Sequence, residues 1–286
     1  MAMVLNTNVA SLTAQRSVNN STNALSTTFK RLSSGLRINS AADDAAGLSI
    51  SDRMTAQIRG FNQSVRNAND TISLVQVTEG ALQETTSALQ RIRELAVAAA
   101  NDTFVSGDRQ DMQKEIDQLL TEINRIANTT QFNGQGLLSG GFVNKQFHVG
   151  ANTNQVIQFS IGSMTTSALN SINVILTGGT SALFGQTLDS LNQKAAETAI
   201  ARLDLAINKV TSQRATLGAL QNRFEAAIAN LSNVSLNTAN ARSRVVDADM
   251  AAEAAKLTQN SIMQQAGTAV LSQANQQPAL ILQLLK

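Results

Sequence analysis

Residues 61–99 read FNQSVRNANDTISLVQVTEGALQETTSALQRIRELAVAA, and this stretch decides the fold of the chain. Apolar or small side chains recur in it at intervals of three and four, and it contains no proline. The positions are Phe61, Val65, Ala68, Ile72, Val75, Leu82, Leu89, Ile92, Ala96 and Ala99. This spacing is typical of the apolar seam of a coiled-coil helix, and it lasts for about five heptads.

A second seam lies near the other end of the chain and repeats at a strict seven-residue interval. It consists of Leu203, Val210, Leu217, Phe224 and Leu231. A single helix in water cannot bury so narrow an apolar stripe. We therefore expect the two runs to pack on each other and on a third helix predicted from Met112 to Ile126. The predicted fold is mainly α: a long coiled-coil helix bundle built from the N- and C-terminal halves, with a small β-hairpin region inserted in the middle.

The composition excludes several classes of protein. The 286 residues are 43% hydrophobic, as in ordered soluble proteins, but include no Cys, Trp or Tyr. Disulfides, a thiolate nucleophile and a zinc–cysteine site are therefore excluded. Lys and Arg number 22 against 20 Asp and Glu, which does not indicate a nucleic-acid partner. No apolar run could span a membrane, and no basic secretory signal precedes Arg16, so we expect a cytoplasmic chain or one exported with its N-terminus intact.

The two ends of the chain are predicted to be helical and to pair. The N-terminal stripe consists of Leu5, Val9, Leu12, Val18, Leu25, Phe29, Leu32 and Leu36, and the C-terminal stripe of Ala251, Ala255, Ile262, Ala266 and Ala269, ending at Pro278. Residues 33–48 contain two glycines and a polar cluster and are predicted to form a hinge, and residues 242–249 a charged break. We therefore expect residues 1–44 and 247–286 to form an inner terminal coiled coil, and residues 45–246 a helical rod.

The middle of the chain, residues 132–187, has a different texture and is predicted to be a small β and loop region. Residues 147–149 and 157–161 alternate in polarity, and the polar run 150–154 between them is typical of a hairpin loop. Residues 163–180 are rich in Ser, Thr and Gly and form our best candidate for an exposed loop.

No residue pattern points to a catalytic, cofactor or metal site. The glycines Gly134, Gly136 and Gly140 have the wrong spacing for a dinucleotide loop and follow a helix instead of a strand. The pairs Asp43–Asp44 and Asp247–Asp249 lack a nearby histidine, so we favour helix capping and surface pairing over metal binding. His148, the single histidine, is expected at the surface of its strand. We predict no enzymatic activity and no cofactor.

Long blocks at both ends closely resemble bacterial flagellin. At the N-terminal end they are residues 5–8 (LNTN), 31–51 (RLSSGLRINSAADDAAGLSIS), 67–70 (NAND), 79–82 (EGAL), 90–96 (QRIRELA) and 131–134 (QFNG). At the C-terminal end they are residues 218–224 (GALQNRF), 241–249 (ARSRVVDAD) and 264–276 (QQAGTAVLSQANQ). The middle departs from the family, whose members often carry large outer domains there, and residue 250 is Met where the family commonly has an aromatic. The resemblance is therefore to a minimal flagellin.

The resemblance implies a structural subunit that polymerises into the extracellular flagellar filament for swimming. It further implies export in an unfolded state by the flagellar type III system, and as partners other subunits, the filament cap, hook-associated junction proteins and an export chaperone. The residues it assigns to core assembly are Leu5, Leu32, Leu36, Val270, Leu271, Leu280, Leu284 and Leu285.

The segment from Gln90 to Leu95 has two interpretations. Arg91 and Glu94 on a helix flank are expected to form ion pairs and axial subunit contacts. By resemblance, the animal Toll-like receptor 5 binds this helix, and Arg91, Leu95 and Glu115 match its contact positions. The C-terminal leucines similarly resemble those bound by cytosolic inflammasome receptors. One surface can serve both roles.

Three other functions are alternatives to the filament subunit. The hook–filament junction protein is a rival from the same family, disfavoured by the closeness of the match at residues 264–268. An exported module that binds polysaccharide or a host receptor is the rival of a different class, but Trp and Tyr are absent. An enzyme is the least favoured.

Overall fold

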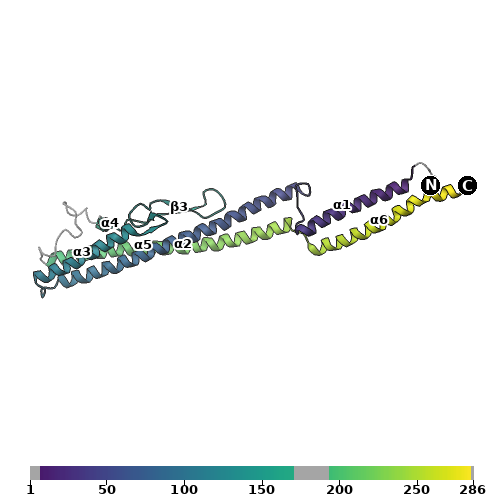
Figure 1. The fold of residues 1–286 in the computed structure, drawn as a ribbon. Coiled ribbons are helices and arrows are strands. Elements are labelled where there is room, and N and C mark those ends of the chain that lie inside the picture. Colours follow the sequence, from purple (N-terminus) through teal and green to yellow (C-terminus); the bar gives the residue numbers. More distant parts are fainter. Residues whose placement is uncertain (1–6, 171–192, 285–286) are drawn as a thin grey trace. The chain divides into compact units, whose positions relative to one another are not determined.

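The computed structural model describes residues 7–170 and 193–284 (Figure 1). These residues form α1 (Val9–Ser34), α2 (Ala45–Ala99), α3 (Ser106–Thr129), α4 (Thr166–Asn170), α5 (Gln193–Val246) and α6 (Met250–Leu284). Two antiparallel hairpins lie between α3 and α4: β1 (Gln131–Phe132) with β2 (Gln135–Gly136), and β3 (Lys145–His148) with β4 (Val156–Phe159). The predicted mainly α class, with a small hairpin region in the middle, is confirmed.

The described residues divide into two compact units. One takes in the chain up to Ile58 and from Leu236 onward, and the other the chain between Arg59 and Ser235. We call them the terminal unit and the rod unit. No helix of the described residues is long and apolar enough to cross a membrane.

Both predicted seams lie in the core of the rod unit. All five positions of the second seam are buried, as is the first seam at Ala68, Val75, Leu82, Leu89, Ile92, Ala96 and Ala99. Three polar contacts join α2 to α5: Asn62 with Ser235, Glu79 with Arg214, and Arg93 with Asp204. Residue numbers rise along α2 from one contact to the next, while they fall along α5. The helices therefore run antiparallel, and within this unit the two sequence-distant seams pack as one core (Figure 1).

The core of α2 also holds a row of hydroxyl groups that the apolar pattern did not predict. Ser64, Thr71, Thr78 and Thr85 are buried at seven-residue intervals. Each donates a hydrogen bond to the carbonyl four residues earlier in the same helix, at 2.8–2.9 Å. Because the helix itself satisfies these hydroxyls, they can be buried on a seam without partners from α5.

The β3–β4 hairpin is fixed to the rod unit by aromatic packing and by its loop. Phe147 and Phe159 stack at 4.9 Å between ring centroids, and both meet the edge of Phe224 on α5 at about 6.5 Å. At the loop, Ser64 Oγ donates to the Gly150 carbonyl at 2.7 Å. The backbone at Gly60 lies so close to the loop that an added Cβ would be 2.9 Å from the Ala151 Cβ.

Two sequence expectations are corrected by the structure. Residues 163–180 were expected to be an exposed loop, but Met164 and Leu169 are buried in the rod core, and residues 171–180 lie outside the described residues. Helix α6 continues to Leu284, beyond Pro278, where the predicted stripe of small residues ends. A proline removes one intrahelical hydrogen bond at a cost of about 3 kcal/mol, which a long helix can tolerate. The charged segment 242–249 is helical up to Val246, and the break is confined to residues 247–249.

Candidate assembly interface

The terminal unit contains an antiparallel pair of helices, α1 and α6, which lie side by side (Figure 1). Polar contacts join them along their length. Arg31 contacts Glu253 at the base of the pair, the end where α1 finishes and α6 begins. Gln264 donates to Thr22 further along, and Asn8 donates to the Ala274 carbonyl near the chain termini. Within a single subunit, α1 and α6 therefore pair along their length.

The face of α1 that packs on α6 differs from the predicted stripe. The less exposed positions recur every three or four residues at Ser11, Ala14, Val18, Ser21, Leu25, Thr28 and Leu32. Val9, Leu12 and Phe29 belong to the predicted stripe but are exposed by 63%, 57% and 53%. The interpretation was wrong at these residues because α1 has two apolar rows on different faces. Spacing by threes and fours does not separate them, so the predicted stripe combined residues of both rows.

The same correction applies to α6. The positions with low exposure are Glu253, Leu257, Asn260, Gln264, Gly267, Leu271 and Ala274. The predicted stripe of Ala251, Ala255, Ile262, Ala266 and Ala269 is exposed. A helix that is apolar on more than one side is typically buried on more than one side. The pair therefore presents a second apolar surface that the described residues of its own chain do not cover.

A groove of about 580 Å³ runs along this pair. Its lining is almost entirely apolar or small: Val9, Ala10, Thr13, Ala14, Ser17, Ser21, Met263, Ala266, Gly267 and Val270. Met263 and Val270 are each 56% exposed. Exposed apolar surface that gathers in this way marks an interaction site in soluble proteins.

The base of the pair is held by a backbone clasp. Helix α1 ends at Gly35, whose φ of 70° is a left-handed conformation that favours glycine. The Ala248 amide donates to the Gly35 carbonyl at 2.9 Å, and the Arg37 amide to the Val246 carbonyl at 2.6 Å. The Arg37 guanidinium also donates to the Val245 carbonyl, at the end of α5. These bonds tie the segment after α1 to the segment before α6.

The segment predicted as a hinge is an ordered turn with helix caps. Asp43 accepts hydrogen bonds from the Ser40 hydroxyl and amide and from the Asn39 amide, and the Ser40 hydroxyl bond is the largest of the effects that lower its pKa. Asp44 accepts from the Gly47 amide at the start of α2, and Asp249 from the Ala251 and Ala252 amides at the start of α6. The capping interpretation is confirmed for Asp44 and Asp249, whereas Asp43 stabilises the turn that precedes α2.

The residues assigned to core assembly fall in several environments. Leu32, Leu36 and Leu271 are half-buried within the terminal unit, whereas Val270 is exposed. Leu280 and Leu284 lie in the last turns of α6, where the structure describes the backbone but not the side chains. Leu5 and Leu285 lie outside the described residues.

The second predicted cluster is an exposed ion-pair network on α2 and α3 of the rod unit. Arg91 Nε donates to Glu115 at 2.9 Å, and Arg91 Nη1 to Glu94 at 3.1 Å. The hydrogen bond that Arg91 donates to Glu115, followed by the one that it donates to Glu94, raises the pKa of Arg91. Gln90 is exposed, but Leu95 is only 7% exposed and belongs to the rod core. The structure thus brings the three charged residues together at the surface and places Leu95 beneath them.

Within the described ranges, no group of three or more metal-ligating side chains comes together. His148 is exposed on β3, as predicted. The apolar surface of α1 and α6 and the ion-paired surface at Arg91 are therefore the candidate functional sites of the described residues.

Comparisons with known proteins agree over the whole chain. Residues 5–142 match the family described as the bacterial flagellin N-terminal helical region, and residues 200–285 the bacterial flagellin C-terminal helical region. The chain is 43% identical to the flagellar filament 33 kDa core protein of Treponema phagedenis over 294 residues, which cover 99% of this chain and all of that protein. It is 44% identical to a flagellin of Halalkalibacterium halodurans over 284 residues, with coverage of 99% and 100%.

A solved structure supports the fold. The chain is similar to Bacillus cereus FlgL with a TM-score of 0.52 and 19% sequence identity, over 67% of this chain and 99% of that one. At this identity the similarity supports the helical architecture alone.

Proposed function

We propose, from the fact that this chain belongs to the bacterial flagellin family, that it is a structural subunit of the flagellar filament whose terminal helix pair packs against neighbouring subunits. The observation that carries the proposal is the uncovered apolar surface of α1 and α6. A lone subunit leaves Phe29, Met263 and Val270 largely exposed to water. A homopolymer would bury these residues once in every subunit, which stabilises the assembled state.

Seeded polymerisation tests this function. Val270→Asp places a carboxylate on the groove, where burial without a partner costs several kcal/mol at each contact. We expect this variant to form no long filaments in negative-stain micrographs, whereas the control Val270→Leu, which keeps an apolar side chain, polymerises. Both soluble variants should keep the helicity of the parent, because residue 270 is exposed in the single subunit. Filaments of normal length from Val270→Asp would contradict the role of this groove.

The finer aspects of the function rest on the family resemblance. We infer unfolded export by the flagellar type III system, assistance by an export chaperone, growth under a cap, and contact with hook-associated junction proteins. The filament would be extracellular, and the chain would perform no chemistry. The inner coiled coil would span residues 1–44 and 247–286, and the outer rod residues 45–246. Whole-chain identity of 43–44% to filament proteins favours the filament over the junction.

Recognition by innate immune receptors is a second proposal, carried by the ion-pair network at Arg91. Gln90, Arg91, Glu94 and Glu115 form one exposed polar surface, with Leu95 under it. It can serve as an axial subunit contact and as a contact for Toll-like receptor 5. The buried position of Leu95 suggests that it supports the surface from below. The leucines Leu280, Leu284 and Leu285 are the corresponding proposal for inflammasome receptors.

Arg91→Ala tests this shared surface. We expect weaker receptor signalling from soluble protein and also impaired polymerisation or motility, with helicity unchanged because Ala favours helices. Lys114→Ala is the control, since Lys114 also forms an ion pair, with Asp111 on α3, and that pair is more exposed than the one at Arg91. An Arg91→Ala strain that swims normally but is silent to the receptor would separate the two roles.

A further inference from the structure

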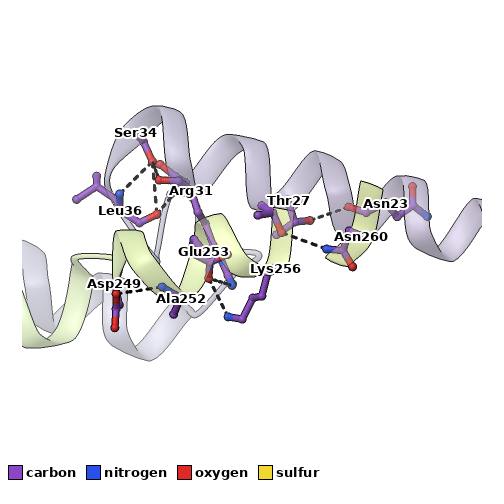
Figure 2. A network of polar contacts seen from close by, with 12 residues as sticks. Asn23, Thr27, Arg31, Ser34, Leu36, Asp249, Ala252, Glu253, Lys256 and Asn260 are labelled. Carbon is purple, nitrogen blue, oxygen red and sulfur yellow. Dashed lines mark hydrogen bonds and ion pairs between the residues drawn. The ribbon is translucent and has the colours of Figure 1, made fainter. Parts of the chain in front are cut away.

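The terminal helix pair contains one buried charged residue, Glu253. It is 5% exposed, and its Oε1 atom lies 2.9 Å from Lys256 Nζ and 3.4 Å from Arg31 Nη1. Figure 2 shows the Glu253 carboxylate on α6 between these two cations, with the Arg31 side chain extending from α1. Lys256 lies on the same helix as Glu253 and its side chain is 54% exposed. Arg31 is thus the cation that joins the two helices.

The other contacts between the two helices are made by neutral side chains, and they contribute to the register without a charged group. The facing positions of α1 include Ser11, Ala14, Ser21 and Thr28, and those of α6 include Asn260, Gln264, Gly267 and Ala274. Small and neutral polar side chains lose little when helices shift by one turn, because similar side chains lie three or four residues away. The clasp at Gly35 and Arg37 restrains the axial position of the helices at this end, so a shift of one turn would also have to break its hydrogen bonds.

A one-turn shift in either direction would break the contact between Arg31 and Glu253. In one direction Glu253 would face Thr27, and Arg31 would face Asp249, whose carboxylate already caps α6. In the other direction Glu253 would face Gly35, and Arg31 would approach Lys256, a like charge. Each shifted arrangement leaves a buried carboxylate without its cross-helix cation, and removing one partner of a buried pair is strongly unfavourable.

The geometry of the contact fits a role in specificity better than one in stability. Glu253 Oε2 and Arg31 Nε are both buried and have no hydrogen-bond partner. Two buried polar atoms without partners mean that the pair is only partly compensated for the loss of hydration. Charged pairs of this kind are best known for fixing register in helical assemblies.

We propose that the Arg31–Glu253 pair determines the register in which the two chain ends pair, and so gives every subunit the same apolar surface for assembly. The proposal rests on the filament function above, since only a repeating lattice requires identical surfaces from every copy. A shift of one turn would displace the row that holds Met263 and Val270 relative to Val9 and would change the groove that they line.

Register can be read by disulfide cross-linking, because the natural chain contains no cysteine. Thr22→Cys with Gln264→Cys reports the native register, since these side chains are 3.2 Å apart. Thr22→Cys with Asn260→Cys or with Thr268→Cys reports a shift of one turn in either direction. Each chain is oxidised mildly in filaments and in solution, and intramolecular cross-links are quantified by peptide mass spectrometry.

With the natural charges, we expect the native cross-link to exceed either shifted one by about tenfold or more. In the double variant Arg31→Leu/Glu253→Leu, this ratio should fall severalfold, while filament yield is at least partly kept. The single variants Arg31→Leu and Glu253→Leu each leave a lone buried charge and should form fewer filaments than the double variant. Arg125→Leu/Glu122→Leu, which removes an exposed pair from α3, is the control and should leave the ratio unchanged.

An unchanged ratio in the double variant would overturn the proposal. So would a double variant that assembles no better than the singles and still forms only the native cross-link, because the pair would then act through stability alone. If the parent cysteine chains form no filaments, the filament function fails, but the register can still be read in solution.

Discussion

Phe224→Ala should lower the stability of the rod unit by about 4 kcal/mol. The ring is fully buried where α5 meets the β3–β4 hairpin. Burying a phenylalanine side chain contributes about 1.5–3 kcal/mol, and its edge contacts with Phe147 and Phe159 add about 0.5–1.5 kcal/mol each. The cavity left by truncation brings the expected loss into the range of about 3–5 kcal/mol found for buried aromatics.

The assay is urea unfolding followed by far-ultraviolet circular dichroism, because the chain has no Trp or Tyr to report by fluorescence. With a slope of about 2–3 kcal/mol per molar urea, the midpoint should fall by about 1–2 M. Phe224→Leu keeps an apolar side chain but loses both edge contacts, so it should cost about 1–3 kcal/mol, less than Phe224→Ala. Val97→Ala, at a site 48% exposed, is the control and should change stability by less than about 0.5 kcal/mol. Equal midpoints for Phe224→Ala and Val97→Ala would refute the assignment of Phe224 as a central core residue.

Three further predictions concern the backbone and the buried acid. Gly60→Leu should displace the hairpin loop from α2 and cost about 1–3 kcal/mol, measured as faster hydrogen exchange at residues 148–156, because its Cβ would overlap Ala151. Gly35→Ala should lower stability by about 1–2 kcal/mol, because residue 35 has a left-handed φ. Gly218→Ala lies at an open helical position and should raise stability by about 0.5–1 kcal/mol. The midpoints of thermal unfolding of the two variants should therefore shift in opposite directions. The hydrogen bond from Lys256, together with Arg31, holds the pKa of Glu253 below its ordinary value of 4.5. The stabilisation from Glu253 is therefore fully present above about pH 4.5 and is lost as pH falls through the lowered pKa; Glu253→Gln should remove this component of a helicity titration.

The rod unit was largely predictable because its apolar seams obey a simple period. Leu203, Val210 and Leu217 recur every seven residues, and nothing else in α5 competes with them as a core face. The row from Ser64 to Thr85 escaped prediction for a chemical reason: a hydroxyl counts as polar in any apolar pattern. Its buried state depends on a bond to its own helix, which the pattern of side chains does not reveal. The seven-residue spacing of this row matches a seam, but counting hydroxyl side chains as polar concealed it.

The terminal unit was harder to predict because its helices have more than one apolar face. Periodicity identifies a stripe, but it does not say whether the same chain or another subunit covers it. Val9 and Phe29 were assigned to the intramolecular face on this basis, and the structure leaves them exposed, while Ala14 and Thr28 pack on α6. Such an error is itself informative for an assembling protein. A stripe that is regular in the sequence, yet uncovered in the folded chain, requires a partner, and for helices at the two ends of one chain a second copy offers the complementary surface in every subunit.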